Sequence, residues 1–208
     1  MTADATQKKQ AFHHGDLRAQ LILAVRELVE ARGADGFSIA EAARAAGVSS
    51  GAPYKHFEDR SDLLRSVAAN GMERLREAMQ TAVEQHPPAS LEGIIAIGLA
   101  YVNFAKAQPG VFRLMFGLTH GHEKSPELSD VGQRTFGVVL SATADHVGET
   151  IASPAVQETA YLLWTHVHGH AFLTIDAKRR ADEGRPDDSY YVARATRAIL
   201  QSHEKADS

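Results

Sequence analysis

Apolar residues recur at helical spacing along almost the whole chain, and no segment of useful length alternates in the way that a strand would. In the first clear example Ile39, Ala42, Ala43 and Ala46 stand three or four positions apart. Similar patterns predict helices over residues 16–32, 50–57, 61–85, 90–108, 109–117, 125–151 and 153–181, and one from Asp187 or Asp188 onward. We therefore predict an all-α protein with about nine helices.

Signals that start and stop helices are clearest around the short helix that begins near residue 39. Ser38 and Glu41 have the spacing of a capping box, and Gly47 can end the helix in a left-handed conformation. One of the two serines that follow can cap a second short helix, with Pro53 in its first turn. Two short helices joined by a turn containing glycine predict a DNA-binding helix-turn-helix.

The residues of this segment also resemble a known family. Residues 43–57 fit the pattern A-x-x-A-G-V-S-x-G-A-x-Y-x-H-F, and Arg60, Leu63 and Leu64 follow it. Over about residues 12–70 the sequence resembles the N-terminal domain of the tetracycline-repressor-like (TetR) family of bacterial transcription regulators. The resemblance implies a three-helix DNA-binding domain followed by a larger helical domain for ligand binding and dimerisation.

The helix layout and the resemblance together divide the chain into three parts. Residues 1–11 are polar and are expected to form a flexible arm. Residues 12–60 would form the helix-turn-helix domain, and residues 61–208 the ligand-binding and dimerisation domain. The helix over 61–85 links the two and could act as a rigid lever, with Gly71 as a possible weak point.

Composition fits a globular protein but does not by itself point to DNA. Of 208 residues, 44% are hydrophobic and 23% charged, and no apolar run approaches the ~20 residues needed to span a bilayer. The N-terminus lacks the apolar core of a signal peptide, so we expect a cytoplasmic protein without a membrane partner. The absence of cysteine excludes disulfides and thiolate sites. Net charge is −4, so a DNA-binding face would depend on how charges are arranged in space.

Under the DNA-binding interpretation, contacts to phosphates position the protein and contacts to base edges read the sequence. The resemblance implies phosphate contacts from Ser38, Tyr54, His56 and Arg60. The front of the predicted recognition helix carries Ser49, Ser50, Gly51, Ala52 and Lys55. Lys55 could approach guanine O6 and N7 or a phosphate, and the sequence leaves both roles open. Arg44, facing out of the preceding helix, is a further phosphate candidate.

The resemblance also implies a small-molecule effector that binds within the larger domain. The candidate lining residues are mostly aromatic: Tyr101, Phe104, Phe112, Met115, Phe116, Phe136, Trp164, His168 and Phe172. Residues of these kinds at helical spacing more often form a simple core. The absence of obvious buried charge favours a mainly apolar effector.

Dimerisation is a further expectation from the family, through the last two long helices packing against their copies as a four-helix bundle. Candidate contacts are Leu162, Leu163, Val167, Tyr191, Ala195 and Ile199. Two recognition helices in a symmetric dimer can read a palindromic operator in double-stranded DNA. We expect a homodimeric, ligand-responsive regulator that is a repressor rather than an activator.

A cluster of histidines within residues 164–170, W-T-H-V-H-G-H, supplies the alternative. His166 and His170 are four apart, the spacing of helical zinc ligands, but no glutamate stands between them in the metalloprotease arrangement. His168 would point to the opposite side, and His120 and His122 could contribute only if the fold brought them close.

The same segment contains W-x-x-x-H-G, which resembles a tryptophan-histidine-glycine feature of the C-terminal domain in some regulators of this family. Gly169 would there permit close helix packing. The alternative is a helical metal-binding protein or an enzyme that uses the histidines of 166–170. No Ser-His-Asp arrangement, glycine-rich phosphate loop or carboxylate pair is visible. We therefore expect no enzymatic activity, cofactor or metal.

Overall fold

The computed structural model of the chain describes residues 17–117, 125–176 and 186–206. All regular structure in these ranges is helical, so the all-α prediction is confirmed. The elements are α1 (Leu17–Arg32), α2 (Ile39–Ala45), the 3₁₀ helix η1 (Pro53–Lys55), α3 (Arg60–Glu84), α4 (Leu91–Ala107), α5 (Pro109–Gly117), α6 (Pro126–Val147), α7 (Pro154–Ile175) and α8 (Asp188–Ala206). The predicted arm over residues 1–11 lies outside the described residues.

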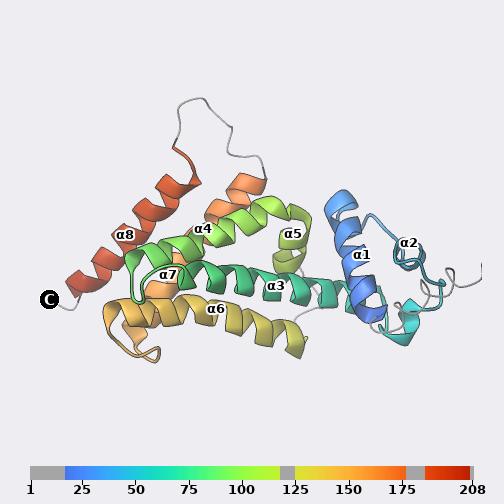
Figure 1. Ribbon diagram of the computed structural model, residues 1–208, viewed down its shortest axis with the longest axis horizontal. Coiled ribbons are helices and arrows are strands. Elements are labelled where there is room, and N and C mark those ends of the chain that lie inside the picture. The colour runs from blue at the N-terminus through green and yellow to red at the C-terminus, as the bar shows by residue number, and fades with distance from the viewer. Residues whose placement is uncertain (1–16, 118–124, 177–185, 207–208) are drawn as a thin grey trace, which may run out of the picture.

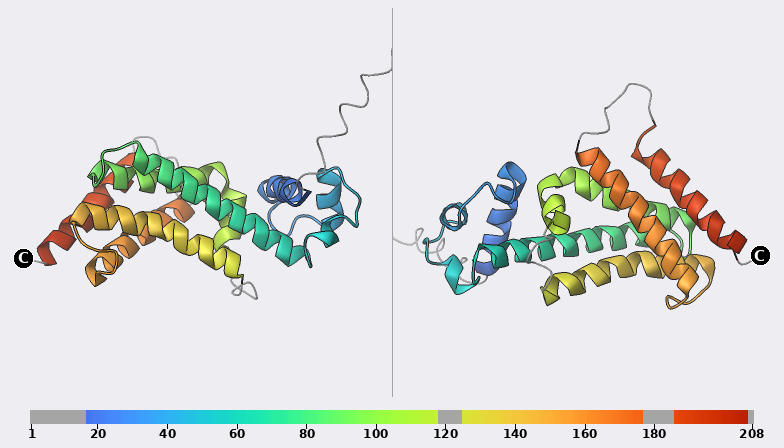
Figure 2. Two further views of the ribbon diagram at one scale, coloured as in Figure 1. Left: turned by 60° about the horizontal axis from the view of Figure 1, so that its bottom comes forward. Right: turned by 180° about the vertical axis from the view of Figure 1, so that it is seen from behind.

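The helices form a small N-terminal module and a larger bundle that are joined by α3 (Figure 1). Helices α1 and α2 lie at one end of the molecule, and α3 begins there and runs lengthwise into the bundle (Figure 2). Along its length α3 packs against α1, α4, α5 and α6. Its buried apolar side chains, from Leu63 to Met79, belong to one hydrophobic core that extends through both parts. The relative placement of module and bundle therefore depends on α3.

The helices α4 and α6 begin within one residue of their predicted starts, each after a serine cap. Ser90 and Ser125 cap α4 and α6, each accepting a hydrogen bond from the backbone N–H three residues later. The helix α6 ends at Gly148, whose φ of 75° lies in the left-handed region, and so stops short of the predicted end near Ile151. The helix α7 ends at Ile175, and the remainder of its predicted range lies outside the described residues.

Gly71 is a position of close packing rather than a weak point in α3. The helix continues through it without interruption, and the residue is buried. A Cβ atom at Gly71 would lie 2.6 Å from Val111 Cγ1 and 3.0 Å from Met115 Sδ, both on α5. The missing side chain therefore allows α5 to approach α3 closely.

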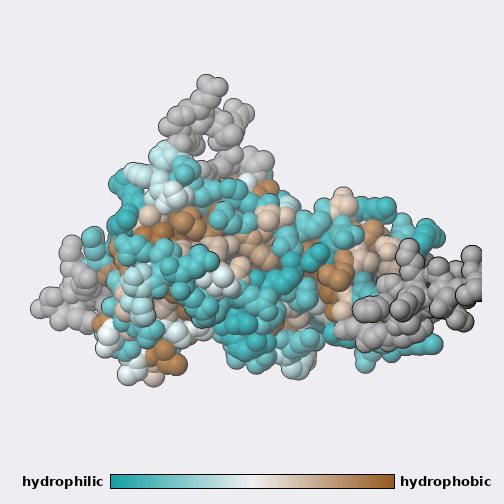
Figure 3. All heavy atoms as spheres, viewed as in Figure 1, coloured by the Kyte–Doolittle hydropathy of each residue, from teal (hydrophilic) through white to brown (hydrophobic). Residues whose placement is uncertain are grey.

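Exposed apolar side chains are concentrated on α7 and α8. The face seen in Figure 3 is largely hydrophilic, with hydrophobic residues over the region of α4 and α8. The large apolar side chains exposed in the bundle are Ile151, Tyr161, Leu162, Leu173 and Tyr190. In the described ranges, no helix has both the length and the apolar character that crossing a membrane requires.

Candidate nucleic-acid interface and ligand cavity

Ser38 and Glu41 form a complete capping box at the start of α2, as predicted. The Ser38 N–H donates to Glu41 Oε2 at 2.9 Å, and the Glu41 N–H donates to Ser38 Oγ at 3.2 Å. Arg32, at the end of α1, donates to Glu41 Oε1 at 3.0 Å. Hydrogen bonds from Ser38 and then Arg32 hold the pKa of Glu41 below its usual value. The start of α2 is thus fixed both to its own cap and to α1.

Gly47 turns the chain after α2 in the predicted left-handed conformation, with φ of 71°. Its N–H donates to the Arg44 carbonyl at 3.0 Å, and the Val48 N–H donates to the Ala43 carbonyl at 2.9 Å. These two bonds form a Schellman motif, which satisfies the last carbonyls of α2. Val48 then packs against the hydrophobic core and sets the direction of the following segment.

The recognition element is shorter than predicted, because it contains only the single 3₁₀ turn η1. Ala52 occupies the N-cap position and makes no side-chain capping bond, so the prediction that a serine caps this element is wrong. Pro53 is its first residue, where its missing N–H does little harm. Gly51, two residues before Pro53, disfavours a helix that would begin earlier.

The side chains of η1 and of the two residues after it form a buried and an exposed side. Pro53 and Phe57 are buried and anchor the turn in the module. Tyr54 is 61% exposed, and Lys55 and His56 are also exposed. The turn therefore presents a hydroxyl, an ammonium and an imidazole group to the surroundings of the protein.

The other predicted DNA-contacting residues lie on the same module. Those that are exposed are Ser38, Arg44, Ser49, Ser50 and Gly51, while Ala52 and Arg60 are half-buried. The Arg60 guanidinium donates to the carbonyls of Phe37 and Ala34 and lies 5.0 Å from the centroid of the Phe37 ring. Arg60 thus fastens the segment before α2 to the start of α3, a structural role that the sequence did not reveal.

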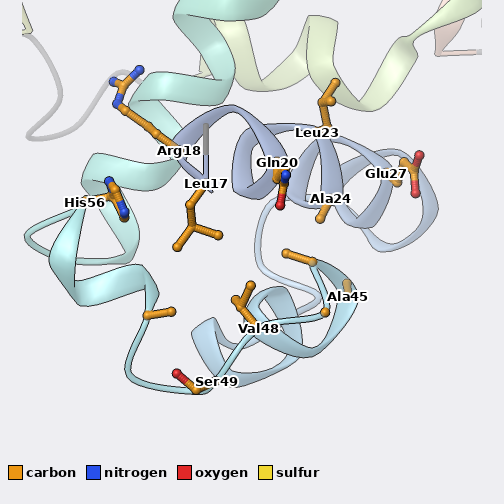
Figure 4. Close-up of a pocket in the computed structure, with 13 residues that line it drawn as sticks. Leu17, Arg18, Gln20, Leu23, Ala24, Glu27, Ala45, Val48, Ser49 and His56 are labelled. Carbon is orange, nitrogen blue, oxygen red and sulfur yellow. The ribbon is translucent and has the colours of Figure 1, made fainter. Parts of the chain in front are cut away.

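A groove of about 1160 Å³ lies between α1 and the helix-turn-helix (Figure 4). Leu17 and Leu23 of α1 and Val48 of the turn supply apolar lining. Ser49 and His56, two of the predicted DNA-contacting residues, also line it. The groove therefore borders the predicted nucleic-acid interface and is separate from the bundle.

The bundle contains a second cavity, of about 380 Å³, lined by residues of five helices, α3 to α7, and open to solvent beside Gln133. Its lining residues are Met72, Leu75, Met79, Tyr101, Phe116, Gly132, Gln133, Thr135, Phe136, Val139 and Trp164. Tyr101, Phe116, Phe136 and Trp164 are four of the predicted ligand-binding residues. The lining contributed by α3 and α6 was not predicted as a site, because an apolar helix face does not reveal whether it meets a neighbour or a space.

The other predicted ligand-binding residues do not line this cavity. They are Phe104, Phe112, Met115, His168 and Phe172. The rings of Phe112, His168 and Phe172 form an aromatic cluster with Phe116, in which the His168 and Phe116 centroids are 4.6 Å apart. The cluster therefore packs against Phe116, which itself lines the cavity.

Tyr101 and His168 make a polar contact within this apolar region. The Tyr101 hydroxyl lies 2.7 Å from His168 Nδ1, and Tyr101 is only 2% exposed. Burial lowers the pKa of His168 and raises that of Tyr101, while the Trp164 indole opposes the second shift. Both side chains are therefore neutral near pH 7.

The histidines proposed as an alternative site do not form a metal centre within the described residues. His166 and His170 share a face of α7, with ring centroids 6.1 Å apart. His170 Nε2 lies 2.9 Å from Asp188 Oδ1, which ties α7 to α8. No three His, Asp or Glu side chains in the described ranges are grouped in a way that could hold a metal ion. His120 and His122 lie outside those ranges.

The predicted dimer contacts divide between the surface and the core. Leu163 and Val167 are only 5% and 8% exposed, because they pack into the core of their own chain. Leu162 is exposed, and the remaining candidates, Tyr191, Ala195 and Ile199, are half-buried.

Gly169 lies on the exposed side of α7, and no atom lies within 4 Å of a Cβ built on it. The expected role of Gly169 in close helix packing is therefore absent within the single chain.

Comparisons with known proteins cover both parts of the molecule. Residues 21–67 match a model of the tetR family of bacterial regulatory proteins, and residues 94–199 match a model of the tetracyclin repressor-like C-terminal domain. A solved structure of a protein of unknown function from Rhodococcus sp. RHA1 is 30% identical, with 93% of this chain and 98% of that chain covered and a TM-score of 0.78. No curated protein matches the sequence.

More distant structures share the fold. A tetR-family transcriptional regulator from Streptomyces coelicolor is 16% identical, with 92% of this chain and 83% of that chain covered and a TM-score of 0.71. A TetR family transcription regulator from Marinobacter aquaeolei VT8 is 18% identical, with 89% and 94% covered and a TM-score of 0.64.

Replacing His168 with Phe should lower the free energy of unfolding by about 1–3 kcal/mol, since it leaves the buried Tyr101 hydroxyl without its partner. Adding Tyr101→Phe should recover part of this loss, because no polar group is then left unpaired. Chemical denaturation of the two variants and the wild type measures both effects. If the loss of unfolding free energy in the double variant equals the sum of the two single losses, the pairing is contradicted.

Stability should also depend on pH through His168. Its pKa is lower in the folded state than its ordinary value of 6.5, so the unfolded chain takes up a proton first. The free energy of unfolding should therefore fall as pH drops below about 6.5, and less steeply in the His168→Phe variant. Parallel pH profiles for the two proteins would show that His168 does not contribute.

Proposed function

This chain belongs to the TetR family of bacterial transcription regulators, and we propose that it is a homodimeric repressor that a small, mainly apolar effector releases from a palindromic operator. The observation that carries the DNA-binding part is the exposure of Tyr54, Lys55 and His56 on a turn anchored by buried neighbours. Such a turn can enter a major groove while its anchors stay in the module. The protein would act in the cytoplasm, without catalysis.

The division of contacts follows from the chemistry of the exposed groups. Hydroxyl and imidazole donors on Tyr54 and His56 suit phosphate oxygens, as does the guanidinium of Arg44. The Ser38 hydroxyl already donates to Glu41 Oε2 at 2.9 Å, so a phosphate would have to compete with the capping box for it. Lys55 is the residue we assign to a base edge, because guanine offers two acceptors that an ammonium can approach. The groove beside α1 leaves Ser49 and His56 accessible from the same side.

The contact between α5 and α1 supplies a route from the cavity to the DNA-binding module. Glu30 of α1 accepts hydrogen bonds from the backbone N–H groups of Gly110 at 3.0 Å and Val111 at 2.7 Å. A Cβ on Gly110 would lie 2.7 Å from the Val29 carbonyl oxygen, so α5 begins directly against α1. The same helix carries Phe116 to the cavity wall. An effector that shifts α5 would thus disfavour the arrangement of α1 that binds the operator.

The exposed side of α7, together with α8, supports the homodimer. Tyr161, Leu162 and Leu173 of α7 and Tyr190 of α8 are large apolar side chains open to solvent in the single chain. Burying them against the same surface of a second copy removes apolar area from water. Gly169, in the middle of this side of α7, would allow two such helices to approach closely.

Lys55→Ala should weaken binding to the operator by about 1–3 kcal/mol more than binding to random DNA, because a base contact is lost. Arg44→Ala should weaken both about equally and reduce the salt dependence by about one phosphate contact. Fluorescence anisotropy with DNA from upstream of the protein's own gene measures these losses at several salt concentrations. Equal losses for Lys55→Ala on the two DNAs would assign Lys55 to a phosphate instead.

Glu30→Gln should free the start of α5 from α1, since an amide nitrogen cannot accept one of the two backbone N–H bonds. We expect hydrogen exchange at Gly110 or Val111 to become about tenfold faster and operator affinity to fall. Glu92→Gln, an exposed change on α4 away from the DNA-binding module, is the matched control. Faster exchange with unchanged operator affinity would show that this contact does not position the DNA-binding module.

A charge placed on the exposed side of α7 should break the dimer. Leu162→Arg combined with Leu173→Arg should halve the mass found by light scattering, because two cations would be buried at the interface. Leu23→Arg changes a similarly exposed leucine on α1 and should leave the mass unchanged. A wild-type monomer at micromolar concentration, or a dimer that survives the α7 changes, would contradict this interface.

A further inference from the structure

The cavity in the bundle restricts the chemistry of its ligand more closely than its apolar character alone. We propose that the effector is an uncharged aromatic molecule whose rings lie among Phe116, Phe136 and Trp164. This proposal rests on the proposed function, in which the bundle binds an effector. Gln133, at the edge of the cavity, provides its polar contact.

None of the residues named as lining the cavity carries a charge. Glu73 and Arg134, from the two helices α3 and α6, pair with each other at 3.0 Å and are not among the lining residues. A carboxylate or ammonium group brought into this space would lose its hydration and gain no partner. The ligand is therefore neutral when bound.

The buried polar groups on the wall are already paired. Thr135 Oγ1 donates to the Val131 carbonyl of its own helix at 2.7 Å. The Tyr101 hydroxyl is held by His168 Nδ1 at the same distance. Gln133 differs from both because it is exposed, and its amide can donate and accept. A ligand with a single polar group can therefore hydrogen-bond there without disturbing the internal pairs.

The shape of the wall favours rings. The ring centroids of Phe136 and Trp164 are 5.9 Å apart, and the ring planes meet at 60°. Phe116 adds a third aromatic surface from α5. Met72 and Met79 line the side formed by α3, where flexible thioethers can adapt to a ring edge. Filled to the density of a protein interior, ~0.74, the cavity takes a molecule of about 280 Å³. Two or three linked rings satisfy this limit.

Gly132 offers a way to close the cavity without disturbing the fold. It lines the cavity, and a Cβ there would meet no atom within 4 Å, so a larger side chain has room to project into the space. Gly137, on the same helix, is equally open around its Cβ but does not line the cavity. Gly132→Leu and Gly137→Leu are therefore a matched pair, with the same gain in helix propensity.

The test compares two probes that share one ring system and differ in charge. N-phenyl-1-naphthylamine is neutral, and 8-anilino-1-naphthalenesulfonate carries an added sulfonate. Trp164 is the only tryptophan of the chain and lines the cavity, so loss of its fluorescence reports occupancy. We expect the neutral probe to quench Trp164 and to bind at least about tenfold more tightly than the sulfonate. Gly132→Leu should abolish this binding, and Gly137→Leu should preserve it.

A second comparison isolates Gln133. Gln133→Leu should weaken the binding of N-phenyl-1-naphthylamine by about fivefold, because the amine of the probe loses a hydrogen-bond partner. The same variant should leave 1-phenylnaphthalene, which has no amine, unaffected. Equal effects on both molecules would remove Gln133 from the proposal.

The remaining outcomes separate the ligand class from the regulatory function. Equal or tighter binding of the sulfonate, or binding that survives Gly132→Leu, overturns the proposed ligand class. The operator titration is repeated with the neutral probe at saturation. If the probe binds as expected and the operator affinity does not change, the ligand class is supported and effector-driven release is refuted.

Discussion

The structure depends on the burial of apolar side chains along α3. This helix starts in the DNA-binding module, continues through the bundle, and contributes to one core that both parts share. Removing apolar surface from water is the largest favourable contribution to folding. A helix whose buried face belongs to both parts therefore couples the stability of one part to that of the other. The N-terminal module is therefore held by the bundle as well as by its own three helices.

Polar contacts fix how the elements around this shared core are oriented against one another. Arg60 binds the carbonyls before α2, Glu41 joins α2 to α1, and Glu30 joins α1 to the start of α5. Each is a hydrogen bond that involves a charged group, which is stronger and more directional than a neutral one. Together they form a sequence of fixed contacts from the recognition turn to the helix that borders the cavity. The arrangement explains how one chain can combine an exposed turn at one end with a separate cavity in the bundle.

Local signals allowed the helices to be predicted, because caps, glycine stops and apolar spacing act within a few residues. The capping box at Ser38 and the left-handed Gly47 were predicted for this reason. Two of the predictions that failed depended on distant partners. Gly71 required knowledge of Val111 on another helix, and Leu163 and Val167 were assigned to the surface because apolar spacing does not say which neighbour a face meets.

The residues of the candidate cavity could be predicted only in part, for the same reason. Its aromatic residues were identified by type, but the contributions of Gly132 and Gln133 had no signal in the sequence. The start of the recognition turn, in contrast, follows from visible residues, since Gly51 disfavours an earlier helix start and Pro53 suits a first position.

The close approach at Gly71 has a mechanical consequence. The atoms of α3 and α5 are already in contact there, and protein interiors resist compression, so α5 has no room to be pushed inward. A molecule that presses on Phe116 would therefore displace α5 along or away from α3 rather than toward it. Because Glu30 bonds the start of α5 to α1, such a displacement would be transmitted to the N-terminal module.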